Sequence, residues 1–133
     1  NTYYWDMPVD DNGFLLLKTA SKQVAFLHVS CTEWKNLFSM EIYGTQGKLD
    51  ISGLGGSYGV ERITHYHMLP QMGPPETQSW EYPMGDNSWD LEMNEFYEDI
   101  SLDRDPRAGL VDAYEALKII QKIYMESNYD HCS

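Results

Sequence analysis

The chain has 133 residues, of which 42% are hydrophobic and 14% aromatic, so it can bury one sizeable core and gives no reason to expect a second domain. Its 21 acidic and 9 basic residues give a formal net charge of -12, which repels nucleic-acid phosphates and anionic lipids. We therefore expect neither nucleic acid nor a membrane as a partner.

The cysteines and the N-terminal residues give information on the cellular compartment and on whether the chain is a fragment. Cys31 and Cys132 are too far apart to suggest a disulfide framework or a metal motif, which favours a reducing cytoplasm. No long apolar run and no basic-then-apolar leader is present, so we expect neither a signal peptide nor a membrane span. Because the sequence opens on Asn1 rather than methionine, we expect a fragment of a longer protein.

The first elements expected are two hairpins. Apolar runs over residues 13–20 and 23–32, separated by a short polar break, predict the first hairpin. In its second run small and aliphatic residues alternate with mixed ones, which places the core on the aliphatic side. Alternation resumes over residues 38–43 and again at Leu49 and Ile51, and the intervening segment 44–47 contributes two glycines expected to take positive φ.

The middle of the chain predicts two more strands joined by loops. Four glycines in residues 53–59 indicate a flexible crossing, after which residues 60–68 alternate as a fifth strand. Three prolines exclude a central strand or a helix from residues 69–76. Residues 77–82 are then expected to form a short strand, with Trp80 on one face.

Two helices close the chain. The first is expected over residues 89–101, with Asn87 or Ser88 as its N-cap. The second follows a restart at Asp105-Pro106, and its apolar residues recur at the spacing of a helix with one buried stripe over residues 110–125.

Six strands followed by two helices predict the α+β class. We expect a single domain over residues 1–133, built as a mostly antiparallel open sheet with both helices packed on one face. Aromatic residues would occupy the other face, so either water tolerates an unusually aromatic surface or a second protein surface covers it. These residues are Phe14 or its neighbours, Phe26, Tyr43 and Tyr66.

Two patterns resemble cofactor or metal motifs and fail on context. Residues 53–59 (GLGGSYG) carry Tyr58 where a dinucleotide fingerprint needs its third glycine, and a strand rather than a helix follows. His65 and His67 share one face of a strand but require a third metal ligand, such as His28 or Glu61. We read the glycines as a loop between strands and the histidines as sheet residues.

Acidic pairs on the first helix are a further candidate for acid-base chemistry. Carboxyl groups can act as general acids or bases. The two pairs are Glu92 with Glu95 and Glu98 with Asp99. On so acidic a helix a solvated face is the better interpretation. We assign no catalytic residue, no cofactor-binding residue and no metal ligand.

The candidate ligand residues are Trp34, Lys35 and Asn36, which directly follow the second strand. An indole, an ammonium and an amide displayed together suit a polyhydroxylated ligand, because the ring stacks on C–H groups while the polar groups bind hydroxyls. An ordinary hairpin loop with an exposed tryptophan is the alternative.

Three stretches resemble the C-terminal domain of the glucose-fructose oxidoreductase, inositol dehydrogenase and MocA family (Gfo/Idh/MocA). Residues 10–34 are similar to the family's opening hairpin. Residues 40–51 (MEIYGTQGKLDI) are similar to its apolar-x-Gly-x-x-Gly-x-apolar hairpin, the most specific of the three. Residues 95–127 are similar to its closing helices, with a Gly-x-x-Asp-Ala start and a Tyr-x-x-Ser end.

This resemblance implies the substrate half of an NAD- or NADP-dependent oxidoreductase that acts on a sugar, a polyol or a derivative. It implies an N-terminal Rossmann domain that binds the cofactor, and subunit contacts through the sheet. The family's Glu-Lys-Pro lysine and Asp-x-x-x-His histidine have no counterpart here, so this chain alone is expected to be inactive. The alternative is a non-catalytic scaffold or dimerisation module with the same sheet.

Overall fold

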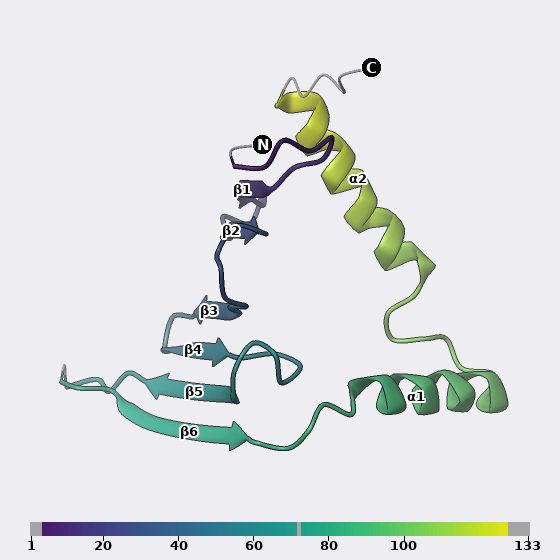
Figure 1. Cartoon of the computed structure of the whole chain (residues 1–133). Coiled ribbons are helices and arrows are strands. Elements are labelled where there is room, and N and C mark those ends of the chain that lie inside the picture. Colours follow the sequence, from purple (N-terminus) through teal and green to yellow (C-terminus); the bar gives the residue numbers. More distant parts are fainter. Residues whose placement is uncertain (1–3, 72, 128–133) are drawn as a thin grey trace. The chain divides into compact units, whose positions relative to one another are not determined.

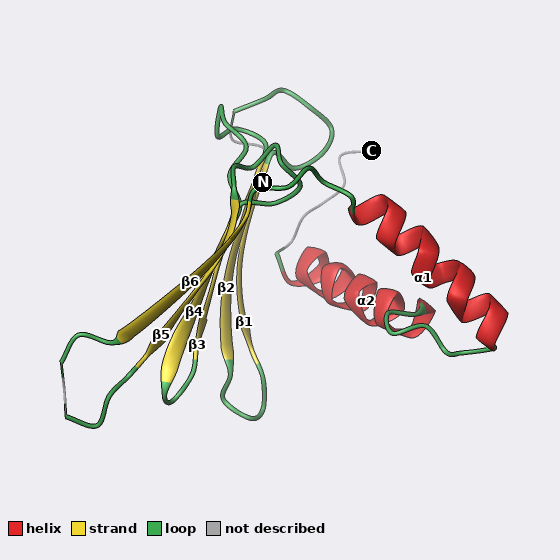
Figure 2. Cartoon of the chain, turned by 90° about the horizontal axis from the view of Figure 1, so that it is seen from below, coloured by secondary structure: helices red, strands yellow, loops and turns green. Residues whose placement is uncertain are grey.

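The computed structural model describes residues 4–71 and 73–127. Its elements run as six strands followed by two helices, and the chain divides into a strand unit that ends at Asp86 and a helical unit that begins at Asn87 (Figure 1). The strands pair antiparallel throughout, which confirms the α+β class. They form two sheets, β1-β2 and β3-β4-β5-β6, rather than the one open sheet expected from the sequence (Figure 2). That the helices pack on one face, and that all elements form one domain, stay predictions.

The two-stranded sheet is a hairpin of β1 (Asn12–Lys18) and β2 (Val24–Ser30). Its turn is closed by a hydrogen bond from the Thr19 amide to the Gln23 carbonyl, 3.0 Å, with Lys22 at a φ of 66°. Along β1 the aliphatic side chains of Leu15 and Leu17 are half-buried, whereas the intervening side chains are exposed. On β2, whose aliphatic side was predicted to face the core, Leu27 and Val29 are exposed, so the burial predicted for that side is not observed.

The four-stranded sheet is a meander in which each strand pairs with the next. Its strands are β3 (Ser39–Tyr43), β4 (Gly47–Ser52), β5 (Glu61–His67) and β6 (Glu76–Tyr82). The inner strands β4 and β5 are more protected than the edge strands, and Thr64 on β5 is buried with its hydroxyl 2.9 Å from that of Ser79.

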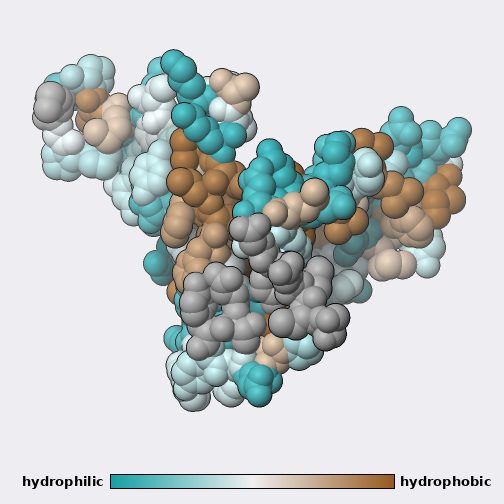
Figure 3. Space-filling view, turned by 90° about the horizontal axis from the view of Figure 1, so that it is seen from above, coloured by the Kyte–Doolittle hydropathy of each residue, from teal (hydrophilic) through white to brown (hydrophobic). Residues whose placement is uncertain are grey.

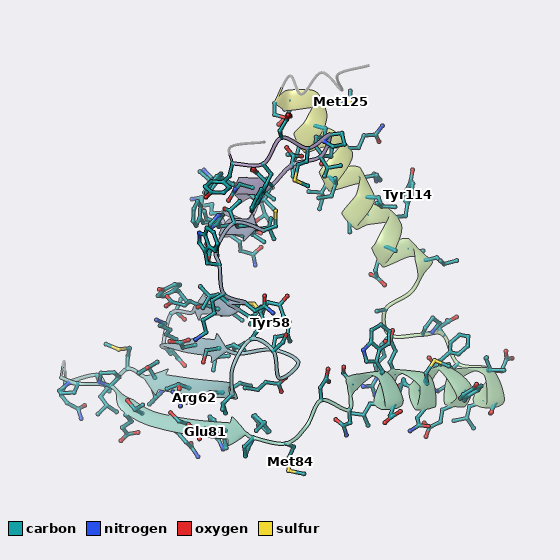
Figure 4. All side chains as sticks on the ribbon, viewed as in Figure 1. Tyr58, Arg62, Glu81, Met84, Tyr114 and Met125 are labelled. Atoms are coloured by element: carbon teal, nitrogen blue, oxygen red, sulfur yellow. The ribbon has the colours of Figure 1, made fainter. Side chains whose placement is uncertain are left out.

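Register gives this sheet one apolar and one polar face. Met40, Ile51, Ile63 and Trp80 are cross-strand partners, so they line a single face. On the other face the ladder is polar, and the Arg62 guanidinium lies 2.8 Å from the Glu81 carboxylate through its Nε (Figure 4).

Glycines explain the two loops of this sheet in different ways. The predicted positive φ at Gly44 and Gly47 is wrong; Gly47 is instead required because a Cβ there would collide with the Tyr66 carbonyl oxygen on β5. In the crossing between β4 and β5 all four glycines do take positive φ, and the Glu61 carboxylate accepts a hydrogen bond from the Gly55 amide, 2.7 Å.

The helical unit contains α1 (Ser88–Leu102) and α2 (Leu110–Glu126). Asn87 is the N-cap of α1, as the sequence predicted, although its side chain makes no capping hydrogen bond. The expected restart at Asp105-Pro106 is wrong by one turn: α2 begins after Gly109, whose amide donates to the Asp112 carboxylate at 2.9 Å. The Asp112 side chain, in the first turn of α2, therefore caps the N-terminus of the helix.

Apolar side chains remain largely exposed in the part of the chain that the structure describes, where the buried residues are Asp11, Asn12, Gly53 and Thr64. Exposed apolar residues, coloured brown in Figure 3, consequently lie among the polar residues, coloured teal. No described helix combines the length and the apolar character needed to cross a bilayer.

Candidate functional site

A cluster of polar side chains lies at the open end of the β1-β2 hairpin, and we call it the hairpin-end cluster. It combines two buried residues, Asp11 just before β1 and Asn12 at its start, with residues from β2 and the loop that follows. Its members are Asp11, Asn12, His28, Ser30, Thr32 and Glu33.

Asp11 anchors the cluster and is only 2% exposed. Its Oδ2 accepts hydrogen bonds from the amides of Tyr4 and Trp5, at 2.7 and 2.9 Å, and its Oδ1 accepts one from Asn12 Nδ2 at 3.1 Å. The backbone of the same residue holds β2, because its carbonyl accepts from the Cys31 amide at 2.9 Å. Asp11 thus ties the segment before β1 to the hairpin.

Asn12 connects this anchor to the other side chains and is 8% exposed. Its Nδ2 lies 3.1 Å from Thr32 Oγ1, and its Oδ1 lies 3.3 Å from His28 Nε2. The Thr32 hydroxyl lies in turn 2.9 Å from the Ser30 hydroxyl. The buried amide therefore has both its nitrogen and its oxygen engaged, as a buried polar group requires.

His28 is held on three sides. Beyond Asn12, its Nδ1 lies 3.5 Å from Glu33 Oε1, and its ring stacks on Phe14 with centroids 4.5 Å apart and planes 9° apart. The side chains of His28 and Glu33 are 35% and 38% exposed. An oriented imidazole and a carboxylate are thus within reach of a ligand.

The predicted ligand residues Trp34, Lys35 and Asn36 directly follow this cluster and are all exposed. Trp34 is 88% exposed, takes a φ of 56°, and meets the Tyr4 ring edge-on at 6.5 Å. A left-handed backbone is unfavourable for so bulky a residue, and such conformations concentrate at functional sites. The structure places the three residues beside the cluster, while their binding role stays a prediction.

Sequence reasoning missed the centre of this site. Asp11 lies within the stretch 10–34 but was not singled out, and His28 appeared only as a possible third metal ligand. A usable signal existed, because period-2 alternation in two paired strands puts Asn12 and His28 on one face. The contact of Glu33 with His28 depends on the loop after β2 and has no such signal.

The other candidates remain separate from this cluster. The rings of His65 and His67 lie 6.0 Å apart on β5, and within the described residues no group of three or more His, Cys, Asp or Glu side chains is arranged to hold a metal. On α1, Glu95, Glu98 and Asp99 surround Arg104, with Asp99 Oδ1 2.8 Å from its Nε. These acids form a surface ion-pair network with Arg104.

The polar face of the four-stranded sheet has its own charged centre at Lys48. Its ammonium lies 3.0 Å from Glu41 and over the rings of Tyr43 and Tyr66, at 5.2 and 5.8 Å from their centroids. Hydrogen bonds from Tyr43 and then from Lys48 lower the pKa of Glu41, while the Glu41 bond raises the pKa of both Tyr43 and Lys48. We call these four residues the lysine cradle.

Comparisons with protein-family models, with curated proteins and with solved structures give no match to this chain.

Proposed function

We propose that this chain is the substrate-side domain of an NAD- or NADP-dependent oxidoreductase acting on a sugar, a polyol or a derivative. The observation that carries the proposal is the hairpin-end cluster beside Trp34. It presents the partly exposed imidazole of His28 and carboxylate of Glu33 next to an exposed indole, a mixture that suits polyhydroxylated ligands. The sequence resemblance to the Gfo/Idh/MocA family supports the same reaction class.

In this proposal the chain binds and orients the substrate, and a Rossmann domain supplies the nucleotide. The 133 residues contain no dinucleotide fingerprint, and their glycine-rich loop is held by Glu61 between two strands instead of opening a helix. The nicotinamide would accept or donate a hydride when bound. We assign no catalytic residue to this chain and expect it to be inactive alone.

The cytoplasm is the compartment we propose. Cys31 is an exposed free thiol, which is compatible with reducing conditions.

A titration of the whole chain tests the proposal. We expect D-glucose, D-galactose, D-ribose or myo-inositol to shift the NMR signals of the Trp34 indole and the His28 ring at millimolar concentration. We expect NADH to leave the spectrum unchanged. Tight NADH binding would contradict the division of roles, and the absence of any shift with all four polyols would contradict the substrate site.

A second candidate function is a non-catalytic dimerisation module. The lysine cradle favours it, since two tyrosines and an ion pair form a structured patch on the face opposite the apolar one. Interface centres are commonly rich in tyrosine. The gene upstream of Asn1 distinguishes the two functions: a strand-Gly-x-Gly-x-x-Gly-helix unit followed by Glu-Lys-Pro supports the enzyme, and its absence supports the module.

A further inference from the structure

Three aromatic side chains meet beside the hairpin-end cluster, and we call Tyr4, Trp5 and Trp34 the aromatic corner. The Tyr4 ring contacts the Trp5 ring at a centroid distance of 5.0 Å and an angle of 73° between the ring planes. It contacts the Trp34 ring at 6.5 Å and 84°. All three residues are exposed, and rings inclined in this way can turn more than one face toward the same ligand.

One side of the aromatic corner is held by the buried Asp11 carboxylate. Its Oδ2 accepts hydrogen bonds from the amides of both Tyr4 and Trp5, at 2.7 and 2.9 Å. The two neighbouring rings are therefore attached to a backbone segment that is fixed against the hairpin. A ligand that contacts them meets an organised surface, which lowers the entropy lost on binding.

The other side of the corner is a tight turn centred on Trp34. The Lys35 amide donates a hydrogen bond to the Glu33 carbonyl, 2.5 Å, and Trp34 between them has a φ of 56°. Three-residue turns with a positive central φ are the rare and strained form. Backbone strain of this kind concentrates at functional sites. Contact with a ligand is therefore a reason for an exposed tryptophan to occupy this turn.

The charge around the aromatic corner is negative. Its rings are carried by residues 4–12 and 30–36, in which acids outnumber bases: Asp6, Asp10, Asp11 and Glu33 stand against Lys35. The excess of acid remains when His28, which contacts Glu33, is counted as a cation. The face of an aromatic ring is also the negative part of its quadrupole. Rings and carboxylates at this place consequently favour the same kind of group, a cation.

On the basis of the proposed function, we propose that the substrate carries a primary ammonium group in addition to its hydroxyls, as an amino sugar or an aminocyclitol does. The ammonium lies against the faces of Trp34 and Tyr4, within the distance of about 6 Å over which a cation is attracted to a ring. The hydroxyls of the same ligand contact the hairpin-end cluster. A neutral sugar can use the same rings only through its C–H groups, so it binds without the charge attraction.

The first test compares ligands that differ in one substituent. D-glucosamine, D-glucose and N-acetyl-D-glucosamine carry an ammonium, a hydroxyl and a neutral amide at the same carbon. Near neutral pH we expect the whole chain to bind D-glucosamine at least about threefold more tightly than either neutral sugar, the scale of an exposed cation–π contact. NMR titration of the Trp34 indole signal measures the three affinities. Added salt should reduce the advantage of D-glucosamine and leave the affinity for D-glucose unchanged.

The second test locates the ammonium. Trp34→Leu and Tyr4→Leu each remove a ring face and should weaken the preference for D-glucosamine, whereas Tyr4→Phe keeps the ring and should retain it. Binding to these variants is followed by calorimetry. Trp89→Leu and Tyr97→Leu on α1 are the matched controls, because Trp89 is 75% exposed against 88% for Trp34, and Tyr97 and Tyr4 are both 60% exposed. Both controls should bind like the unaltered chain.

Equal affinity of the unaltered chain for D-glucosamine and D-glucose would overturn the ammonium assignment and leave the proposed function standing. A preference that is lost in the α1 variants and kept in the Trp34 and Tyr4 variants would also overturn it. No binding of D-glucosamine or of any of the four polyols would overturn both the assignment and the proposed function. The comparison of ligands uses the unaltered chain, so it decides even where a variant fails to fold.

Discussion

At the scale of single residues, the most protected side chain in the described part of the molecule is an acid rather than a hydrocarbon. Asp11 is 2% exposed, and its two oxygens hold the amides of Tyr4 and Trp5 and the side chain of Asn12. Buried carboxylates are retained where such donors offset the cost of leaving water. Asp11 therefore organises the site without needing to touch a ligand.

Replacing Asp11 with alanine should lower the free energy of unfolding by about 3 kcal/mol, because three donors lose their acceptor in a buried setting. Urea denaturation followed by circular dichroism measures the change. Asp6→Ala is the control, since Asp6 is exposed in the same segment. Equal stability of the two variants would show that the Asp11 contacts contribute little.

At the scale of elements, the sequence determined the strands and helices more closely than the connections between them. Alternation and short apolar runs identified the strands, and three-and-four spacing identified α2, because both periods follow from backbone geometry. The start of α2 was misplaced because Gly109 with Asp112 begins the helix instead of Pro106. The division into two sheets was missed because alternation assigns faces within a strand but does not specify which strands pair.

The lysine cradle makes the stability of the four-stranded sheet depend on pH. The folded-state pKa of Glu41 is lowered from 4.5, so the unfolded chain binds the Glu41 proton more readily than the folded chain does. The resulting stabilisation is present above about pH 4.5. It is lost as pH falls through the lowered pKa. The raised pKa values of Tyr43 and Lys48 act at the opposite end, where stabilisation is lost as pH rises past their usual values of 10.0 and 10.5.

We therefore expect Glu41→Gln to be less stable than the unaltered chain near neutral pH, by a small amount because the site is exposed, and the difference to vanish as pH falls below 4.5 and through the lowered pKa of Glu41. Urea unfolding at neutral pH and in acid measures this difference. Glu76→Gln, at the exposed start of β6, should match the unaltered chain at both. A difference for Glu41→Gln that persists in acid would contradict the assigned origin.

At the scale of the whole molecule, a net charge of -12 disfavours close approach of two copies, so self-association needs a specific patch. We propose the lysine cradle as this patch, because it places a cation near two aromatic rings and a carboxylate on an exposed sheet face. Resemblance to a family with sheet-mediated subunit contacts led to the prediction of a homo-oligomer. The strand register shows which residues of that sheet lie together on its polar face. Alternation within each strand could not establish this, because it does not align one strand with the next.

Sedimentation velocity tests the oligomer. We expect the unaltered chain to sediment as a dimer or larger, and Tyr43→Glu to sediment as a monomer because a second carboxylate beside Glu41 places like charges at the contact. Tyr43 is 72% exposed, and Tyr97→Glu on α1, at 60% exposure, is the matched control. Dissociation of both variants alike would exclude the cradle as the contact, and a monomeric unaltered chain would exclude the oligomer.

The pairing order of the strands also has a consequence for how the chain acquires its structure. Every strand pair joins sequence neighbours, β1 with β2 and then β3 through β6 in succession, with no crossover. Such local pairings need only short loops to close, which favours rapid formation. During synthesis each strand can therefore pair as soon as the next one emerges from the ribosome, and the hairpin that carries Asn12 and His28 can form before any helix has been made.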